Sequence, residues 1–402
     1  MRNVYLLLAI LVLVTSCTKD SNVNKGEDLV LTADEQQRTE ADNKFSLKLF
    51  KELAADAGKD NLVFSPLSLS MAIAMTSNGS SGQTLEGIRA AMEFSGATEE
   101  QINSYYNKLL AKLPVLDPAA DVKLANSIWY RQDFTVSPAF LQVNKNSYNA
   151  AVQPLNFSDP AAPGKINTWV NDKTNGKITE IVDNIPADMI MYLINAVYFK
   201  ANWKYQFDKS KTQKAVFHTA GDGDVQADFM TIKTSLNTSY SSDGFVVELP
   251  YGNEKYSMVL LLPATGKSVQ DVINAANPAS WNTWMNSLKK EGTTIYLPRF
   301  LINYDVELND ILKGFGMELA FSYVADFTRI NTNGDLRISK VKQKAFIEVN
   351  EAGTEAAAVT SVGIEFTSSS GGIKFDRPFL FAIREMKTGL ILFNGIVNNP
   401  TK

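Results

Sequence analysis

The sequence predicts an α+β fold, because segments with helical periodicity and segments with strand patterns follow one another along a chain that shows no internal repeat and no second domain. One such helix is expected to begin after Ser65, which can cap it, with Pro66 in its first turn and Asn78-Gly79 as its stop. Its residues are apolar on nearly all sides, as in a helix at the centre of a protein. The run Met191–Lys200 has the pattern of a buried strand. With 402 residues and 45% hydrophobic content, the chain can bury a sizeable core.

Five further elements are expected along the chain. A helical stripe is formed by Phe45, Leu49 and Leu53. The expected elements are a helix from residue 41 to 57, a strand from 124 to 130, a helix within the run 166–178 that ends just before Gly176, a hairpin of residues 246–250 and 257–263, and a helix from 308 to 314.

Composition excludes several classes of function. The 39 basic and 43 acidic residues give a net charge of −4 without strong clustering, so no electrostatic footprint for nucleic acid is present. The chain has one Cys and one His, which rules out an internal disulfide and a zinc site of Cys and His ligands. Cys/His catalysis would require Cys17 and His218 to meet. The chain is therefore expected to bind no metal.

Hydrolase and nucleotide-binding motifs are also missing. The sequence contains no Gly-x-Ser-x-Gly, no Walker phosphate loop and no His-Glu-x-x-His. His218 lies in a strand-like run and is expected to be structural. Residues 331–335, Asn-Thr-Asn-Gly-Asp, lack the distal Glu of a calcium loop and are expected to form a turn. The sequence predicts no enzyme activity and no cofactor.

The N-terminus has the features of an export signal. Arg2 precedes an apolar run from Val4 to Val14, too short to span a bilayer comfortably as a mature anchor. Val14-Thr15-Ser16-Cys17 resembles a bacterial lipobox, so residues 1–16 are expected to be removed and Cys17 to be lipidated. An ordinary signal peptide cut near Ser16 is the alternative. Residues 17–40 are polar and are predicted to be a disordered tether, followed by one domain from 41 to 402.

Thr18 bears on the location of the protein. An Asp after the lipidated Cys resembles an inner-membrane retention signal, and Thr18 stands there instead. We therefore expect a lipoprotein of the outer membrane or cell surface, with a secreted or periplasmic protein as the alternative.

The segment from Lys344 to Phe375 has a strand pattern with loop chemistry on both sides. Every second residue from Thr354 to Phe366 is small or apolar, which is the period of a strand with one buried face. Glu351-Ala352-Gly353 precedes the run and a Ser/Gly-rich stretch follows it. The pattern favours either a strand kept outside its sheet or an ordinary edge strand followed by a flexible turn.

The flanks of this segment resemble one protein family. The octapeptide Glu351–Ala358, Glu-Ala-Gly-Thr-Glu-Ala-Ala-Ala, resembles the hinge before the reactive loop of the serpins, and Phe375–Phe381 resembles the segment after that loop. The resemblance extends from about Ala41 to Pro400. It implies the serpin fold: a single domain of about nine helices and three β-sheets with an exposed reactive-centre loop, here residues 353–374, in a chain expected to be a monomer.

The resemblance also implies a mechanism. A protease attacks the loop and forms an acyl-enzyme, and the cleaved loop then inserts into the central sheet as a new strand. The family's hinge residues correspond to Glu351, Gly353, Thr354, Ala356, Ala357 and Ala358. The small residues Thr354, Ala356 and Ala358 argue against the main rival, a non-inhibitory serpin that acts as a surface binder or carrier, because bulky or charged residues would be expected there.

The loop length common in the family places the attacked bond at Thr367-Ser368. Thr367 would suit elastase-like or subtilisin-like proteases first. A papain-like cysteine protease could use the same bond because of Phe366, and a chymotrypsin-like enzyme could cut Phe366-Thr367.

A polar cluster beneath the sheet, the shutter, controls its opening in this family. By position, Ser65, Ser68 and Asn195 match three of its members, and Gln343 stands where the fourth is usually His. Gln both donates and accepts, so the network can persist, but without the pH response of an imidazole.

Overall fold

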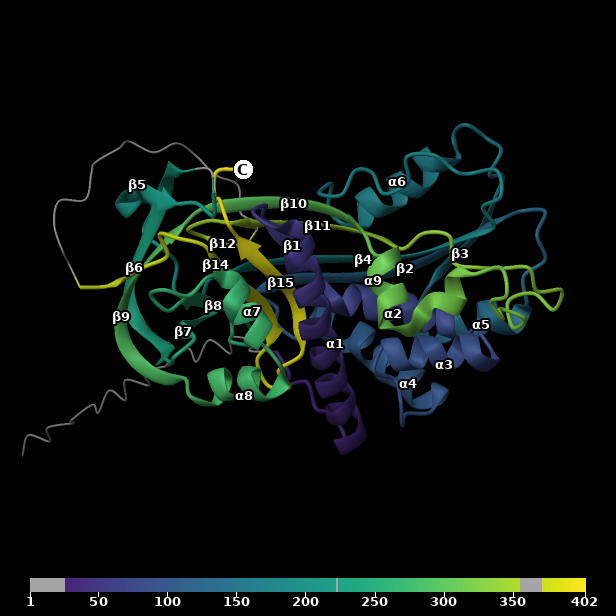
Figure 1. Cartoon of the computed structure of the whole chain (residues 1–402), viewed down its shortest axis with the longest axis horizontal. Coiled ribbons are helices and arrows are strands. Elements are labelled where there is room, and N and C mark those ends of the chain that lie inside the picture. Colours follow the sequence, from purple (N-terminus) through teal and green to yellow (C-terminus); the bar gives the residue numbers. More distant parts are fainter. Residues whose placement is uncertain (1–25, 222, 355–370) are drawn as a thin grey trace, which may run out of the picture.

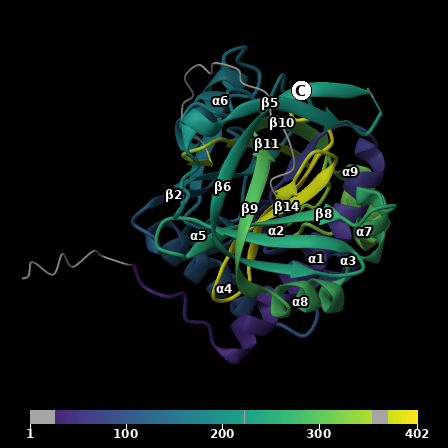
Figure 2. The ribbon, with the colours of Figure 1, turned by 90° about the vertical axis from the view of Figure 1, so that its left-hand side faces the viewer.

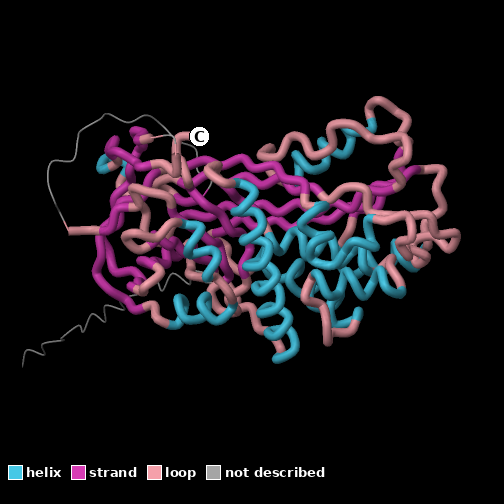
Figure 3. Tube along the Cα trace, viewed as in Figure 1, coloured by secondary structure: helices cyan, strands magenta, loops and turns pink. Residues whose placement is uncertain are grey.

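The structure, a computed structural model, describes residues 26–221, 223–354 and 371–402 (Figure 1). Within these residues, helices gather mainly on one side of a long sheet, and a second sheet curves away at the opposite end of the molecule (Figures 1 and 3). The α+β class expected from the sequence is confirmed. The described part of the chain contains nine α-helices.

One sheet has six strands and contains the start of the predicted reactive loop. Its outer pairs are antiparallel β10–β11 and β2–β4, with β3 added parallel to β2. In spatial order the strands are β10 (Phe300–Glu307), β11 (Lys342–Val349), β12 (Gly353–Thr354), β4 (Met191–Asn202), β2 (Ala120–Arg131) and β3 (Ala151–Leu155).

The other sheet has nine strands and curves strongly (Figure 2). Its strands are β1 (Leu62–Phe64), β15 (Ile391–Val397), β14 (Phe379–Glu385), β8 (Tyr256–Pro263), β7 (Gly244–Pro250), β6 (Asp224–Tyr240), β9 (Lys289–Pro298) and β13 (Ile373–Lys374), with β5 (Gln213–His218) also on β6. The described residues therefore form two hydrogen-bonded sheets where three were expected. The reason is the 17-residue length of β6, which pairs with β9 up to Thr238 and with β7 from Asn237.

Nine helices surround these sheets. Their bounds are α1 (Ala33–Ala57), α2 (Pro66–Ser77), α3 (Gly82–Ala91), α4 (Glu99–Lys112), α5 (Pro138–Tyr148), α6 (Ala162–Lys173), α7 (Val269–Ala275), α8 (Pro278–Asn286) and α9 (Asn309–Leu312). Helix α6 packs on the face of the six-stranded sheet opposite α2, where Ile166 and Val170 contact a separate apolar cluster that includes Trp129 of β2 and Ile194 of β4 (Figure 1).

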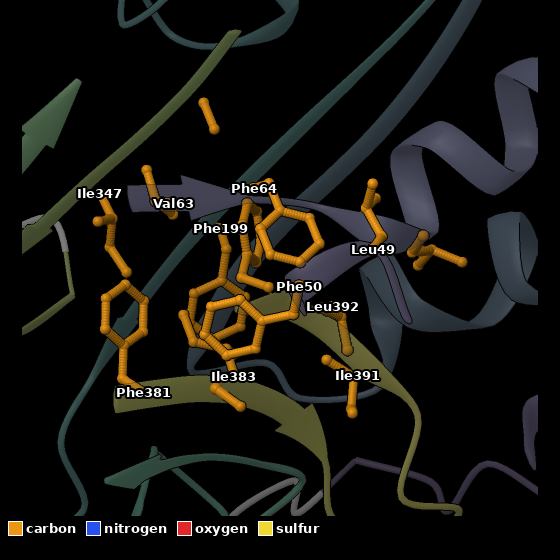
Figure 4. Close-up of a cluster of buried hydrophobic side chains, with 14 of the residues drawn as sticks. Leu49, Phe50, Val63, Phe64, Phe199, Ile347, Phe381, Ile383, Ile391 and Leu392 are labelled. Atoms are coloured by element: carbon orange, nitrogen blue, oxygen red, sulfur yellow. The ribbon is translucent and has the colours of Figure 1, made fainter. Parts of the chain in front are cut away.

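Helix α2 is the central helix that the sequence predicted. Ser65 caps it, with its hydroxyl accepting from the Ser68 amide at 3.2 Å, and Pro66 is its first residue. The main core extends from this helix to both sheets. Figure 4 shows Phe50 of α1, Phe64 of β1 and Phe199 of β4 converging with side chains of β14 and β15. The helix is thus held between the two sheets by apolar contacts on nearly every side.

The predicted disordered tether is too long. Helix α1 begins at Ala33 and not near residue 41, because Thr32 and Glu35 form a capping box in which each side chain bonds the other's backbone amide. Upstream of it, Leu29 is buried in the core. Asp28 pairs with Lys255 at 2.6 Å and Lys387 at 2.9 Å, and hydrogen bonds from these lysines lower its pKa to about 2. The chain is therefore docked on the domain from residue 28 onward.

The other predicted elements are found close to their expected positions. The strand predicted from 124 to 130 is the middle of β2, the run from Met191 is β4, and the hairpin is β7–β8. His218 ends β5 and its Nδ1 lies 2.7 Å from Asp224. Asn331 and Gly334 close a hydrogen-bonded turn, as predicted. Among the described residues, no helix is long and apolar enough to cross a membrane.

Candidate functional site at the opening of the six-stranded sheet

The first residues of the predicted loop are already part of the six-stranded sheet. Strand β12 consists of Gly353 and Thr354 and lies between β11 and β4, with Thr354 opposite Val349 on one side and Ala201 on the other. A Cβ at Gly353 would lie 2.0 Å from the carbonyl oxygen of Ala201. Only glycine allows the two backbones to approach so closely.

Gly353 and Thr354 separate β4 from β11, and we call this pair the wedge. Thr354 is only 2% exposed. Its hydroxyl lies 2.5 Å from the hydroxyl of Tyr251, and burial raises the pKa of Tyr251 well above its ordinary value. Tyr251 stacks on Trp203, with ring centroids 4.5 Å apart and an interplanar angle of 11°. The Trp203 indole in turn donates to the carbonyl oxygen of Asn350 at 2.8 Å. The hinge is therefore held by a fully bonded aromatic pair.

Glu351 anchors the turn that leads into this wedge. Its carboxylate accepts from Nε of Arg299 at 2.8 Å, from a terminal nitrogen of the same guanidinium and from the hydroxyl of Thr212. Burial acts to raise the pKa of Glu351, but the hydrogen bonds from Arg299 and Thr212 outweigh it and hold the pKa below its ordinary value. Backbone bonds from Trp203 and Phe207 to residues 352 and 351 complete the attachment.

Beyond the wedge, the six-stranded sheet is open. In the described residues β4 pairs with β2 along one edge, and its other edge is paired only at Ala201 and Asn202. Likewise β11 pairs with β10 along its whole length and with β12 only at Val349. In the described residues, β4 and β11 thus form no ladder with each other beyond the wedge, an arrangement open to an additional strand.

A cavity of about 450 Å³ occupies the far part of this opening. It is lined by residues 188–195 leading into and along β4, residues 335–344 leading into β11, and the α2 side chains of Leu69, Ala72 and Ile73 beneath. A separate, much smaller pocket lies at the level of Thr354 and is lined by Thr354, Val197, Phe199 and Ile347 among others. We refer to the cavity and this smaller pocket together as the sheet opening.

Three of the four predicted shutter residues, Ser68, Asn195 and Gln343, line the cavity, and the fourth, Ser65, is bonded to Gln343 and Ser68. The Gln343 side chain accepts from the Ser65 amide at 3.0 Å and donates to the Ser65 carbonyl oxygen at 2.9 Å. The Ser65 hydroxyl donates to the carbonyl oxygen of Leu392 at 2.8 Å. Ser68 is bound through its amide, as described above. These contacts tie β11 to the start of α2 through a side chain that has no titratable group.

Asn195 belongs to the same cluster but has different partners. Its Nδ2 donates to Oδ1 of Asn126 at 2.6 Å and approaches the sulfur of Met71 at 3.7 Å. Its Oδ1 is buried and has no hydrogen-bond partner in the described structure. An unpaired buried polar atom of this kind costs free energy unless something else supplies a partner.

Several predicted site residues fall outside the described residues. They are Cys17, Ala356, Ala357, Ala358, Phe366, Thr367 and Ser368. In the part of the chain that the structure describes, no group of three or more His, Cys, Asp or Glu side chains is arranged to hold a metal ion.

Sequence reasoning did not assign the residues that hold the hinge. Trp203, Tyr251, Thr212 and Arg299 lie 52 to 147 positions away from the residues they bind at the hinge, and Asn126 lies 69 positions from Asn195. No local pattern reports such pairs. Pro298-Arg299, at a break between two strand-like runs, is a local signal for one of them.

Comparison with known proteins agrees with this geometry. The model of the family described as serpin (serine protease inhibitor) matches residues 40–400, so the chain belongs to the serpin family. Human neuroserpin is 33% identical over 377 residues, which cover 90% of this chain and 91% of neuroserpin. Serpin A3-3 of Bos taurus is 35% identical over 366 residues, covering 89% and 88% of the two chains.

Solved structures show the same fold. The native-state crystal structure of tengpin, a thermophilic serpin, has a TM-score of 0.82 and 32% identity, covering 93% of this chain and 96% of tengpin. Human thyroxine-binding globulin, crystallised with thyroxine, has a TM-score of 0.84 and 27% identity, covering 92% and 100%. Native protease nexin-1 with heparin has a TM-score of 0.79 and 27% identity, covering 91% and 100%.

Proposed function

We propose that this serpin inhibits proteases by trapping the acyl-enzyme while the cleaved reactive loop inserts into the six-stranded sheet. The observation that carries the proposal is the position of Thr354, which already sits between β4 and β11 at the head of an unfilled opening. Strand insertion would extend an existing two-residue strand, so it needs no new nucleation.

The register of β12 indicates where the rest of the loop would go. Thr354 lies opposite Val349 and Ala201, and both pairings are antiparallel. Each step of two residues along the loop therefore moves two residues back along β4 and β11, which places Ala358 between Val197 and Ala345. Even-numbered loop residues would share the buried face of Thr354, and these are the small and apolar residues of the sequence pattern.

The free energy available from insertion is large. Burial of Val362, Ile364 and Phe366 in the apolar part of the opening would contribute about 5 to 9 kcal/mol. About a dozen new ladder hydrogen bonds at roughly 0.5 to 1.5 kcal/mol each would add a similar amount. The sum is comparable to the roughly 5 to 15 kcal/mol that stabilises an ordinary domain. Such a reaction supplies enough free energy to distort a bound protease.

The class of target protease is inferred from the residues that precede the cleaved bond of the reactive loop. We propose cleavage at Thr367-Ser368 by elastase-like or subtilisin-like proteases first, with papain-like enzymes at the same bond or chymotrypsin-like enzymes at Phe366-Thr367 as further targets. Thr354 to Thr367 spans fourteen residues, or roughly 46 Å when extended. A cut at either bond leaves a strand long enough to fill the opening.

The test mixes the protein from Thr18 onward with one protease of each class and resolves the products on a denaturing gel. We expect a band at the summed mass of inhibitor and protease, together with a released peptide that begins at Ser368. The control is the same protease with its nucleophile replaced, which cannot form an acyl-enzyme and should give no band. Cleavage without a complex in every mixture would contradict the inhibitory mechanism.

A carrier function is the competing proposal, because thyroxine-binding globulin shares this fold at a TM-score of 0.84 and was crystallised with thyroxine. The two functions differ in the behaviour of the cut chain. An inserted loop should raise the thermal unfolding midpoint by tens of degrees, whereas a carrier that does not insert its loop should show no rise.

We further propose that Cys17 is lipidated and holds the protein at the bacterial outer membrane or cell surface. Its support is the position of the only Cys in the chain at the end of the lipobox-like Val14–Cys17. Expression of the full chain and of Cys17→Ser tests the proposal. The parent protein should be recovered in the membrane fraction, and the variant in the soluble fraction; equal distribution would contradict it.

A further inference from the structure

The docked segment before α1 and the turn after α4 expose apolar side chains at one corner of the domain. Val30 is 66% exposed and Val115 is 67% exposed. Beside Val115 in the chain, Pro118 and Ala119 are exposed as well. We call these four residues the apolar corner, and we propose that it rests on the lipid surface to which Cys17 would attach the chain. The inference rests on the proposed lipidation and adds to it the face of the domain that meets the membrane.

The two parts of the apolar corner belong to one surface, because the docked segment lies directly on the turn after α4. A Cβ on Gly26 would lie 1.9 Å from the carbonyl oxygen of Leu116 and 3.2 Å from Cδ of Pro118. Next to this contact, Lys112 and Glu27 form an ion pair at 3.5 Å. The exposed side chains of the segment and of the turn therefore lie on neighbouring parts of the same surface.

The exposure of Val30 is a result of how the segment is anchored. Leu29 is buried, and Leu31 packs against the main core. Asp28 is held by two lysines, as described above. Side chains of an extended chain alternate between two faces, so the neighbours of Val30 hold it outward. It cannot turn into the core without release of the whole segment.

Charged side chains around the apolar corner are paired with one another. Glu27, Asp28 and Glu35 each lie within 3.5 Å of at least one lysine ammonium. The lysines involved are Lys108, Lys112, Lys255 and Lys387. Attraction to anionic lipid needs clustered, unpaired basic residues. We therefore expect the apolar side chains to carry the contact, without a requirement for anionic lipid.

The length of chain before the docked segment favours the membrane as the occupant of this surface. Nine residues of chain lead from Cys17 to Gly26, so Gly26 can lie at most about 30 Å from a lipidated Cys17. A short tether makes a second contact effectively intramolecular and gives it a high effective concentration. Apolar contacts too weak to bind a free protein to lipid can thus persist in the anchored one.

Contact through the apolar corner would leave the hinge away from the lipid. Helix α1 has 25 residues and is about 37 Å long at 1.5 Å per residue. Its first turn follows the docked segment at the lower edge of Figure 1, whereas its last turn lies near β1, with β12 toward the upper part of the molecule. The hinge and the apolar corner are therefore at opposite ends of this helix.

A labelling experiment tests the proposed contact. Because Cys17 is the only cysteine and would carry lipid, a new cysteine supplies the single free thiol. Val30→Cys and Leu301→Cys are each labelled with a polarity-sensitive fluorophore in the full lipidated chain, inserted into phosphatidylcholine vesicles. We expect the label at residue 30 to be shielded from aqueous iodide and the label at residue 301, an exposed position of β10, to stay accessible. Shielding at both positions or at neither overturns the proposal.

A second substitution tests whether the two parts of the apolar corner act together. Val115→Asp would bring a charge to the lipid and remove a valine, whose burial shifts an equilibrium by about tenfold. The label at residue 30 should then be quenched by iodide as readily as in the unlipidated Cys17→Ser protein. Leu301→Asp is the matched control and should leave that label shielded. Since both positions are exposed, both variants should unfold at the parent's midpoint; unchanged shielding with Val115→Asp overturns the proposal.

The outcomes separate this inference from the proposed lipidation. Recovery of the full chain in the soluble fraction overturns lipidation, and the inference with it. Recovery in the membrane fraction with an accessible label at residue 30 overturns the inference alone. Shielding only in vesicles that contain phosphatidylglycerol would assign the contact to basic residues, and shielding without vesicles would assign it to a second copy of the chain. Either result overturns the role of the apolar corner as a lipid-binding face.

Discussion

The two ends of the sheet opening differ in how completely they are bonded. At the hinge end, Gly353 and Thr354 are paired on both sides, and Glu351 is held by Arg299 and Thr212. At the far end, the edges of β4 and β11 face a cavity of about 450 Å³ without ladder partners. In the proposed insertion, the starting point is thus already hydrogen-bonded on both sides, whereas the driving force would lie in polar and apolar groups along the cavity.

A substitution at Thr354, in the fully paired hinge end, is expected to have the largest effect on the formation of inhibitor–protease complex. Thr354→Arg would place a charge at a position that is 2% exposed and displace the bond to Tyr251. Burial of an unpaired charge costs several kcal/mol, so insertion should fail and the inhibitor should become a substrate. Complex on a denaturing gel should fall more than tenfold. Thr354→Ser is the matched control, and an unreduced yield of complex with Arg would refute the mechanism.

Glu351 is the second point at which the hinge end can be loosened. Glu351→Ala would leave the Arg299 guanidinium, whose side chain is 19% exposed, without its carboxylate. Loss of one partner of a buried ion pair typically costs about 3 kcal/mol or more. Chemical unfolding of the uncut protein should report that loss. Lys214→Ala, which removes an exposed ion pair near the hinge, is the control and should change stability by less than 1 kcal/mol.

The ion pair at Glu351 also predicts a pH dependence. Its pKa in the folded protein lies below the ordinary value of 4.5. A carboxyl with a lowered folded pKa contributes stability above its unfolded pKa and loses it as the pH falls through the folded pKa. The stability difference between the parent and Glu351→Gln should therefore be constant near neutral pH and shrink below about pH 4.5. A difference that grows on acidification would contradict the assigned pairing.

Substitutions of Gln343 test the bonding at the cavity end of the sheet. Gln343→Ala would remove two buried hydrogen bonds to Ser65, at a cost of about 2 kcal/mol in the free energy of unfolding. Gln343→His should instead make stability vary with pH near the imidazole pKa of about 6.5. His218 is present in both proteins, so the readout is the difference in stability between Gln343→His and the parent; a difference that stays constant between pH 5 and 8 would contradict the assigned position of residue 343.

The smallest effect on the uncut protein is expected from partial filling of the opening. Ala72 lines the cavity, and Ala72→Leu would place methyl groups in its floor and stabilise the uncut protein by about 1 kcal/mol. The same groups would obstruct the incoming strand, so more inhibitor should be consumed per protease trapped. Equal stoichiometry for variant and parent would mean that the strand does not pass over Ala72.

Local signals in the sequence carried the prediction furthest. Helix α2 was predicted from Ser65, Pro66 and its apolar run, and the hinge was predicted from the Glu351–Ala358 motif. The capping box of Thr32 and Glu35 is equally local, yet the polar composition around it favoured disorder and concealed the start of α1. Composition alone cannot reveal that Leu29 finds a place in the core.

Long-range pairing set the limit of prediction. The contacts of Arg299 with Glu351 and of Tyr251 with Thr354 join residues 52 and 103 positions apart, and such partners follow from the fold rather than from any local pattern. The number of sheets is equally hard to predict. It depends on the residues of β6 at which pairing with β9 ends and pairing with β7 begins. Motifs locate the hinge, but its attachments emerge only in three dimensions.

The docking of Asp28 on Lys255 and Lys387 would limit how far the domain reaches from a membrane if Cys17 is lipidated as proposed above. With Cys17 in the membrane, a free chain up to residue 41 could extend about 80 Å, whereas a chain held from residue 28 can extend only about 37 Å. The domain would then work close to the lipid headgroups. Its targets would be proteases that approach the cell envelope itself, and enzymes diffusing through the surrounding medium would be met only on contact with the cell.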